Sequence, residues 1–237
     1  VCSSDLRGEG IWLYDTDGKK YLDCLSAYSA VNQGHCHPRL VETMQKQCQQ
    51  LTLTSRAFRN EQLPLFCKEL SEFTGFERVL PMNSGGEAVE TAIKAARKWG
   101  YMVKGVPANQ AEIIVAENNF HGRTTTIISF TTEDQYKSGF GPLTPGFITV
   151  PYGDLKALKN AITENTVAVF LEPIQGEGGI IIPPEGYLEG VQAICQENNS
   201  LFILDEIQTG LGRCGKLFAY EYEPVKPDAL VVGKALS

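Results

Sequence analysis

Three ionisable residues follow three apolar runs in the second half of the chain. Glu172 comes directly after TVAVFL, Asp205 after LFIL, and Lys234 after DALVVG. These runs are rich in β-branched residues and do not alternate with polar ones, which is typical of strands covered on both faces. The carboxyl ends of parallel strands meet at one edge of a sheet, where ligands bind. We therefore expect two acids and one amine at a common site, although each alone is equally typical of a solvated strand end.

A glycine turn supplies a second part of this site. In MNSGGEAVETAIKAARKW, Ser84 can cap a helix that starts at Glu87, while Gly85 and Gly86 let a ligand approach the backbone closely. The free N–H groups and the positive end of the helix dipole favour an anion such as phosphate. The segment is neither a P-loop nor the three-glycine dinucleotide motif. An ordinary strand-to-helix turn is the alternative for this stretch.

A phosphate site, an acid and an amine together match what pyridoxal phosphate requires. The Lys234 amine can attach to the cofactor aldehyde, and the Asp205 carboxylate can pair with the protonated pyridine nitrogen. Lys234 follows four apolar residues and one glycine, so we expect partial desolvation, which makes an amine more reactive. A solvated lysine at a strand end is the alternative.

Strands and helices alternate from about residue 61 onward. The pattern predicts an α/β domain with a mostly parallel sheet flanked by helices, joined by right-handed crossovers. The expected strands are 78–82, 112–116, 147–152, 166–172, 201–206 and 228–234, and the expected helices are 87–99, 154–161 and 185–198.

Residues 7–60 form a separate N-terminal segment, which we assign to a small domain. Apolar and polar residues alternate around Asp17-Gly18, which predicts a β-hairpin. Helical spacing predicts one helix that begins at Pro38 and another across residues 60–73. Residues 1–6 fit poorly with the hairpin segment after them, and we interpret them as a non-native scar. The chain stops soon after an apolar run, so we expect the large domain, residues 61–237, to be truncated.

Composition argues against several classes of protein. The net charge is −7 without a basic stripe, which disfavours nucleic acid as a partner, and no apolar run approaches the roughly 18 residues of a membrane span. The seven cysteines are scattered without a C-x-x-C pair, which is typical of free thiols in a reducing compartment. His35-Cys36-His37 places neighbouring side chains on opposite sides and no fourth ligand is evident, so we expect no metal.

Seven segments resemble class III (fold type I) pyridoxal-phosphate aminotransferases, over nearly the whole chain. They are LDEIQTGLGR, EPIQGEGG, NFHGRT, MNSGGEAVETAIK, YSAVNQGHCHP, LTLTSRAF and GKALS. YSAVNQGHCHP, LTSRAF, KWGY and GKALS are most similar to the ornithine-specific branch. The resemblance implies a homodimer that transfers the δ-amino group of ornithine to 2-oxoglutarate, giving glutamate semialdehyde and glutamate. Acetylornithine or 4-aminobutyrate as the amine, and a non-catalytic truncated chain, are the alternatives.

The resemblance also implies cofactor-binding roles for individual residues. Lys234 matches the lysine that carries the cofactor and moves the proton during the reaction. Gln208 matches the residue that hydrogen-bonds the phenolic oxygen, and Phe120 the aromatic that stacks on the ring. Gly85 and Gly86 match the phosphate turn. The family often has Ala or Val at the second of these positions.

Further residues match substrate-binding positions of the family. Arg123 aligns with the arginine that binds a substrate carboxylate, and Glu172 and Glu177 align with two family acids. Glu177 corresponds to the glutamate that pairs with a C-terminal arginine when ornithine is bound. Tyr28 matches the tyrosine that shapes the pocket of ornithine-specific members. We assign no role to His121.

Several of these residues have ordinary alternatives. Tyr28 and Phe120 are also consistent with packed core aromatics, and Arg123 and Glu177 with surface ion pairs. Family members are mitochondrial in some lineages and cytosolic in others, so the sequence leaves both the cytoplasm and the mitochondrial matrix open.

Overall fold

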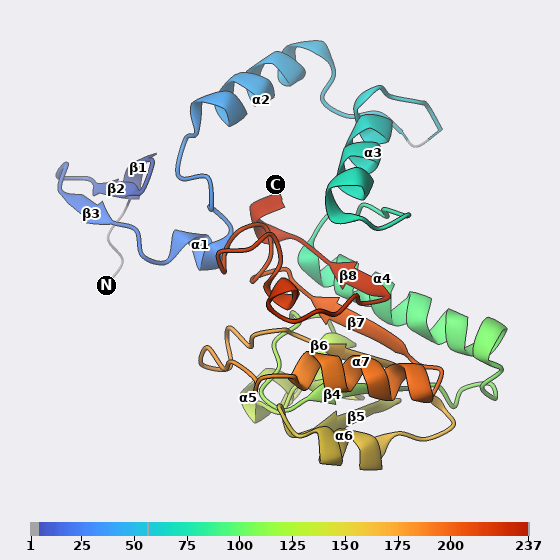
Figure 1. Cartoon of the computed structure of the whole chain (residues 1–237). Helices are drawn as coiled ribbons and strands as arrows, with labels where there is room; N and C mark the ends of the chain where they lie inside the picture. Colours follow the sequence, from blue (N-terminus) through green and yellow to red (C-terminus); the bar gives the residue numbers. More distant parts are fainter. Residues whose placement is uncertain (1–4, 56, 237) are drawn as a thin grey trace. The chain divides into compact units, whose positions relative to one another are not determined.

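The computed structural model describes residues 5–55 and 57–236, and the chain divides into two compact units between Pro81 and Met82 (Figure 1). The boundary that we predict near residue 61 lies inside the first unit. The elements of the first unit are β1 (Asp5–Glu9), β2 (Trp12–Asp15), β3 (Lys20–Leu22), α1 (Ser26–Ser29), α2 (Pro38–Gln50) and α3 (Gln62–Thr74). Of the predicted scar, residues 1–4 lie outside the described residues, and the last two residues begin β1.

The predicted hairpin around Asp17-Gly18 is confirmed, and β1 extends it to a three-stranded antiparallel sheet in the order β1-β2-β3. Asp15 forms the turn because its Oδ1 accepts the N–H of Asp17 at 3.0 Å and of Lys19 at 2.9 Å. Gly18 takes a positive φ of 77°, which glycine adopts without a steric penalty. The predicted helix start at Pro38 is also confirmed.

A left-handed turn carries Tyr28. All four residues of α1 have positive φ values, and Tyr28 itself lies at 56°. The segment before this turn is fixed by Asp23, whose Oδ1 accepts the N–H of Ser26 at 2.9 Å and whose Oδ2 lies 2.7 Å from His35 Nε2. His35 therefore anchors a turn within the first unit.

The second unit contains the main sheet and the helices that cover it. Its elements are α4 (Gly85–Trp99), the π-helix η1 (Gly100–Lys104), β4 (Glu112–Ala116), the 3-10 helix η2 (Ile127–Phe130), α5 (Asp134–Lys137), β5 (Phe147–Val150), α6 (Leu155–Ala161), β6 (Thr166–Leu171), α7 (Tyr187–Glu197), β7 (Leu201–Asp205), the 3-10 helix η3 (Ala219–Tyr222), β8 (Ala229–Val231) and the 3-10 helix η4 (Lys234–Leu236).

The predicted parallel sheet flanked by helices is confirmed. Its order is β5-β4-β6-β7-β8, and every neighbouring pair is parallel. In β4, Ile113 and Val115 belong to the core cluster that contains residues of α4, while Ile114 and Ala116 belong to the one that contains residues of α6 and α7. The helix α4 covers one face of the sheet, and α6 and α7 cover the other (Figure 1). All residues of β6 and residues 113–116 of β4 are buried, which explains the uninterrupted apolar runs.

Two predicted strands differ from the structure by more than two residues. Residues 78–82 form no strand, because Pro81 lacks an N–H for pairing and the Leu80 side chain is 63% exposed. The strand predicted at 228–234 is shorter, since β8 ends at Val231. Lys234 does not end this strand but begins η4 with a positive φ of 48°.

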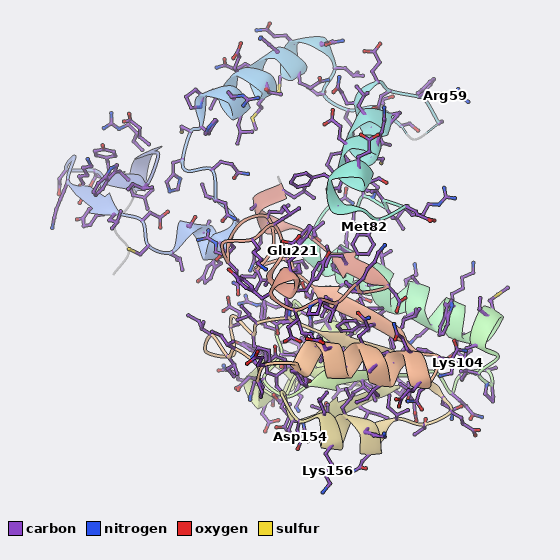
Figure 2. All side chains as sticks on the ribbon, in the orientation of Figure 1. Arg59, Met82, Lys104, Asp154, Lys156 and Glu221 are labelled. Atoms are coloured by element: carbon purple, nitrogen blue, oxygen red, sulfur yellow. The ribbon has the colours of Figure 1, made fainter. Side chains whose placement is uncertain are left out.

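Lys104 connects three segments at the amino end of the sheet strands (Figure 2). Its ammonium donates to the carbonyl oxygen of Thr166 at 2.5 Å, the carbonyl oxygen of Asn198 at 2.9 Å and Ser200 Oγ at 3.2 Å. Burial lowers the pKa of Lys104 from its ordinary value. This lysine therefore links the segments at the amino ends of β6 and β7. No helix in the described part of the chain is long and apolar enough to cross a membrane.

Replacing Lys104 by methionine keeps most of the apolar part of the side chain and removes its three donated hydrogen bonds. We expect Lys104→Met to lower the free energy of unfolding by about 2 kcal/mol, measured by urea denaturation. The control Lys94→Met alters an exposed lysine of α4 and should change it by less than about 0.5 kcal/mol. Equal effects of the two substitutions would contradict this role.

Candidate functional site

A cavity of about 210 Å³ opens at the carboxyl edge of the main sheet, entirely within the second unit. It collects residues from the glycine turn, the loop after β4, the ends of β6 and β7, and the start of η4. The predicted site residues that line it are Gly85, Gly86, Phe120, Glu172, Asp205, Gln208 and Lys234. The two acids and the amine that the sequence places after three apolar runs thus share one cavity.

The glycine turn forms the start of α4. The helix begins at Gly85, two residues earlier than predicted, and Ser84 caps it by accepting the N–H of Glu87 on Oγ at 3.2 Å. A Cβ on Gly86 would have only ordinary contacts, the nearest at 3.6 Å, whereas one on Gly85 would lie 3.1 Å from Ile207 Cδ1. Because both glycines line the cavity, unpaired N–H groups of the first helical turn lie beside it.

The four remaining predicted residues lie outside the lining. Ser84 is the helix cap, and the Arg123 guanidinium lies 5.8 Å from the centroid of the Phe120 ring. Glu177 is exposed, and its Oε1 accepts a hydrogen bond from Gln208 Nε2 at 3.0 Å. Tyr28 belongs to the first unit and is 61% exposed.

The Asp205 carboxylate has a donor on each oxygen. The residue is the last of β7 and is only 4% exposed. Oδ1 accepts the N–H of Ile207 at 3.0 Å, and Oδ2 lies 2.6 Å from His121 Nδ1. These contacts stabilise a carboxylate that is otherwise removed from water.

His121 is a site residue to which the sequence alone assigns no role. Its side chain is fully buried, and its ring stacks on Phe170 with centroids 4.5 Å apart and planes at 19°. Burial lowers the pKa of the imidazole, but the hydrogen bond and negative charge of Asp205, with the charge of Glu172, raise it above its ordinary value overall. The available signal was its place beside Phe120 in NFHGRT, but a loop gives no periodicity to show which way a side chain points.

Burial shifts the pKa values of Glu172 and Lys234 in opposite directions. Burial raises the pKa of Glu172 to about 7, and its Oε2 accepts the N–H of Phe120 at 3.0 Å. Burial lowers the pKa of Lys234 from its ordinary value, against the opposing charges of Glu177, Asp205 and Glu172. Both shifts favour the uncharged form, which for an amine is the nucleophilic form.

The buried Glu206 side chain stabilises the loop after β7 by hydrogen bonds. It is 1% exposed, its Oε1 accepts the N–H of Tyr220 at 2.8 Å, and its Oε2 accepts the hydroxyl of Thr209. Burial raises the pKa of Glu206 to about 7.

Within residues 5–55 and 57–236, no group of three or more His, Cys, Asp or Glu side chains is arranged to hold a metal ion.

Comparisons with known proteins agree on one family. The model of the family described as aminotransferase class-III matches residues 4–237. The ornithine aminotransferase of Brevibacillus brevis is 60% identical over 230 residues, which cover 97% of this chain and 58% of that protein. The crystal structure of the ornithine aminotransferase from Toxoplasma gondii matches with a TM-score of 0.98 and 45% identity, covering 100% of this chain and 56% of that one. An acetylornithine aminotransferase from Elizabethkingia anophelis matches with a TM-score of 0.86 and 48% identity, covering 99% of this chain and 55% of that one.

Glu206 makes stability depend on pH. Its carboxyl has an ordinary pKa of 4.5 in the unfolded chain and about 7 in the folded one, so the folded state binds the extra proton between these values. The free energy of unfolding should therefore fall as pH rises from 4.5 to 7 and level off above it. In Glu206→Gln, the free energy of unfolding should fall by about 2–3 kcal/mol less over this pH range than in the wild type. Some fall should remain, because the pKa of Glu172 is also raised to about 7.

The measurement is urea denaturation of both proteins at intervals from pH 4.5 to 8. Glutamine can still accept the Tyr220 N–H, so a loss of packing alone would lower stability equally at every pH. Parallel curves for the two proteins would show that Glu206 does not bind this proton.

Proposed function

The chain belongs to the class III aminotransferases, and from this premise we propose that it is the cofactor-binding part of an enzyme that transfers the δ-amino group of ornithine to 2-oxoglutarate. The products are glutamate semialdehyde and glutamate. The chain spans 58% of the length of its Brevibacillus brevis relative, so the activity is proposed for the complete polypeptide. The observation that carries the proposal is the presence of Asp205 and Lys234 in the lining of one cavity.

The residues of the cavity fit pyridoxal phosphate. When bound, this cofactor supplies an electron-withdrawing pyridine ring that stabilises negative charge on the substrate carbon. The cavity offers an amine for the aldehyde, a buried carboxylate for the ring nitrogen, and an aromatic face from Phe120. The N-terminus of α4, with Gly85 and Gly86, offers N–H donors for the phosphate.

Lys234 is proposed to act as both the attachment point and the base. Because its pKa is lowered, a larger fraction of its Nζ is unprotonated near neutral pH than for an exposed lysine. This nitrogen would hold the cofactor through its aldehyde carbon, and in the unprotonated form it would serve as the base that moves the proton of the substrate carbon. The buried Asp205 carboxylate is proposed to hold the pyridine nitrogen protonated.

The remaining residues are proposed to orient the cofactor and the substrate. Gln208 lines the cavity, where its amide would hydrogen-bond the phenolic oxygen of the cofactor, and its Nε2 donates to Glu177 Oε1. Arg123 has the planar guanidinium suited to a substrate carboxylate. Glu172 holds the backbone of Phe120 and thereby the aromatic face of the site. Tyr28 is proposed to contribute to recognition of ornithine.

A homodimer is proposed as the working form. The helices α2 and α3 have no buried residues, and large apolar side chains of the first unit are exposed, including Met44 at 68% and Phe73 at 59%. Apolar surface of this kind favours association with another polypeptide surface. We propose that a second copy of the enzyme covers this surface.

The activity is tested on the protein expressed from its complete coding region. We expect glutamate semialdehyde, trapped with o-aminobenzaldehyde, from ornithine and 2-oxoglutarate, with higher kcat/KM than for acetylornithine or 4-aminobutyrate. Lys234→Ala should abolish the product, and Tyr28→Ile should reduce the preference for ornithine about tenfold, as expected for a lost specific contact. Faster turnover of another amine would reassign the substrate, and no turnover of any would favour a non-catalytic protein.

The close approach of Gly176 to the Gln208 side chain allows the position of Gln208 to be tested by substitution. A Cβ at residue 176 would lie 1.6 Å from Gln208 Oε1, so Gly176→Ala must displace this amide. We expect Gly176→Ala and Gln208→Ala each to weaken cofactor binding about tenfold, as for one lost hydrogen bond to a charged group. The double variant should match Gln208→Ala alone, because the clash then has no partner. Additive losses in a fluorescence titration would show that Gly176 acts independently of Gln208.

A further inference from the structure

We propose that His121 is a positioning residue that fixes the Asp205 carboxylate for its contact with the pyridine nitrogen of the cofactor. This inference rests on the proposed function, but it concerns a residue to which neither the sequence motifs nor the comparisons give a role. It is carried by the contact between two buried side chains, His121 Nδ1 and Asp205 Oδ2, at 2.6 Å.

The two donors on Asp205 come from one nearby residue and one residue distant in the sequence. Ile207 donates its backbone N–H to Oδ1, and His121 donates from a loop 84 residues earlier in the sequence to Oδ2. An ionised carboxylate only accepts hydrogen bonds, so the proton of this contact belongs to His121 Nδ1. With one donor on each oxygen, the carboxylate cannot rotate without breaking a contact. Its remaining acceptor positions are available to the cavity, which Asp205 lines.

His121 is itself held in place by aromatic packing. Its ring stacks on Phe170 and is tilted against Phe130, with centroids 5.9 Å apart in the second contact. Its side chain is fully buried, and in the described part of the chain Nε2 has no hydrogen-bond partner. The neutral Nδ1–H form and the imidazolium both donate from Nδ1, so the contact survives in either state. The charged groups near it are Asp205 and Glu172, which both favour retention of a proton on the ring.

A packing role is the competing explanation. His121 fills space between Phe130 and Phe170, and many buried histidines serve only to fill such space. The two roles differ in what a substitution does to the cofactor. A packing defect disturbs every ligand of the cavity alike, whereas loss of the Nδ1–H donor weakens only a ligand whose ring nitrogen pairs with Asp205.

The experiment compares pyridoxal phosphate with its 1-deaza analogue, in which a C–H group replaces the ring nitrogen. His121→Phe keeps an aromatic ring and removes the donor, and His121→Asn places an amide N–H close to the position of Nδ1. Phe130→Leu is the matched control, since it disturbs the packing around His121 without touching its contact with Asp205. All four proteins are expressed from the complete coding region, and dissociation constants are measured by fluorescence titration.

We expect His121→Phe to weaken pyridoxal phosphate about tenfold and the deaza analogue less than about twofold, as for loss of one charge-assisted hydrogen bond. His121→Asn should recover most of the selectivity, and Phe130→Leu should leave it unchanged. Equal weakening of both ligands by His121→Phe, or weakening of neither, would overturn the inference. If the wild-type protein binds neither ligand, the proposed function itself fails, which is a separate outcome.

A second measurement needs no substitution and so does not depend on the variants folding. In a protein labelled with ¹⁵N-histidine, the Nδ1–H signal of His121 should shift on binding of pyridoxal phosphate and stay in place on binding of the deaza analogue. The same shift with both ligands would contradict the inference.

Discussion

The structure of the site depends on the burial of the Asp205 carboxylate at the end of a central strand. A charged group removed from water is costly unless donors compensate it. Here Ile207 and His121 supply one donor to each oxygen. With one donor on each oxygen, the carboxylate still has acceptor positions for a cation in the cavity that Asp205 lines. This is the electrostatic condition for holding a protonated pyridine nitrogen.

The parallel sheet provides this condition for a geometric reason. The strands β6, β7 and β8 are neighbours and run in one direction, so the segments that follow them meet at the same edge. Asp205 is the last residue of β7 and Glu172 directly follows β6, so both lie at this edge. Lys234 follows β8 after two intervening residues and has a positive φ of 48°. The helices on both faces exclude water from the strands, and the resulting burial shifts the pKa values of Glu172 and Lys234 toward their uncharged forms. The burial that stabilises the sheet is therefore also the cause of the shifted pKa values in the cavity.

Much of this arrangement can be predicted from the sequence. The apolar runs predict β4, β6 and β7 closely, and the three ionisable residues expected at a common site, Glu172, Asp205 and Lys234, line one cavity. Residues 78–82 mislead because an apolar run with a proline satisfies composition without the N–H that pairing needs. His121 is missed for a different reason. It lies in a loop, and only the tertiary contact between two distant segments brings its ring onto Asp205.

The central claim is that Asp205 and Lys234 act on one bound pyridoxal phosphate. It is tested most directly by reducing the cofactor-loaded protein with borohydride and mapping the modified lysine by mass spectrometry. With one equivalent of cofactor, the account predicts a pyridoxyl group on Lys234 in the wild-type protein and its loss from that position in Asp205→Ala. Labelling spread over exposed lysines in the wild type, or unchanged labelling of Lys234 in the variant, would contradict it.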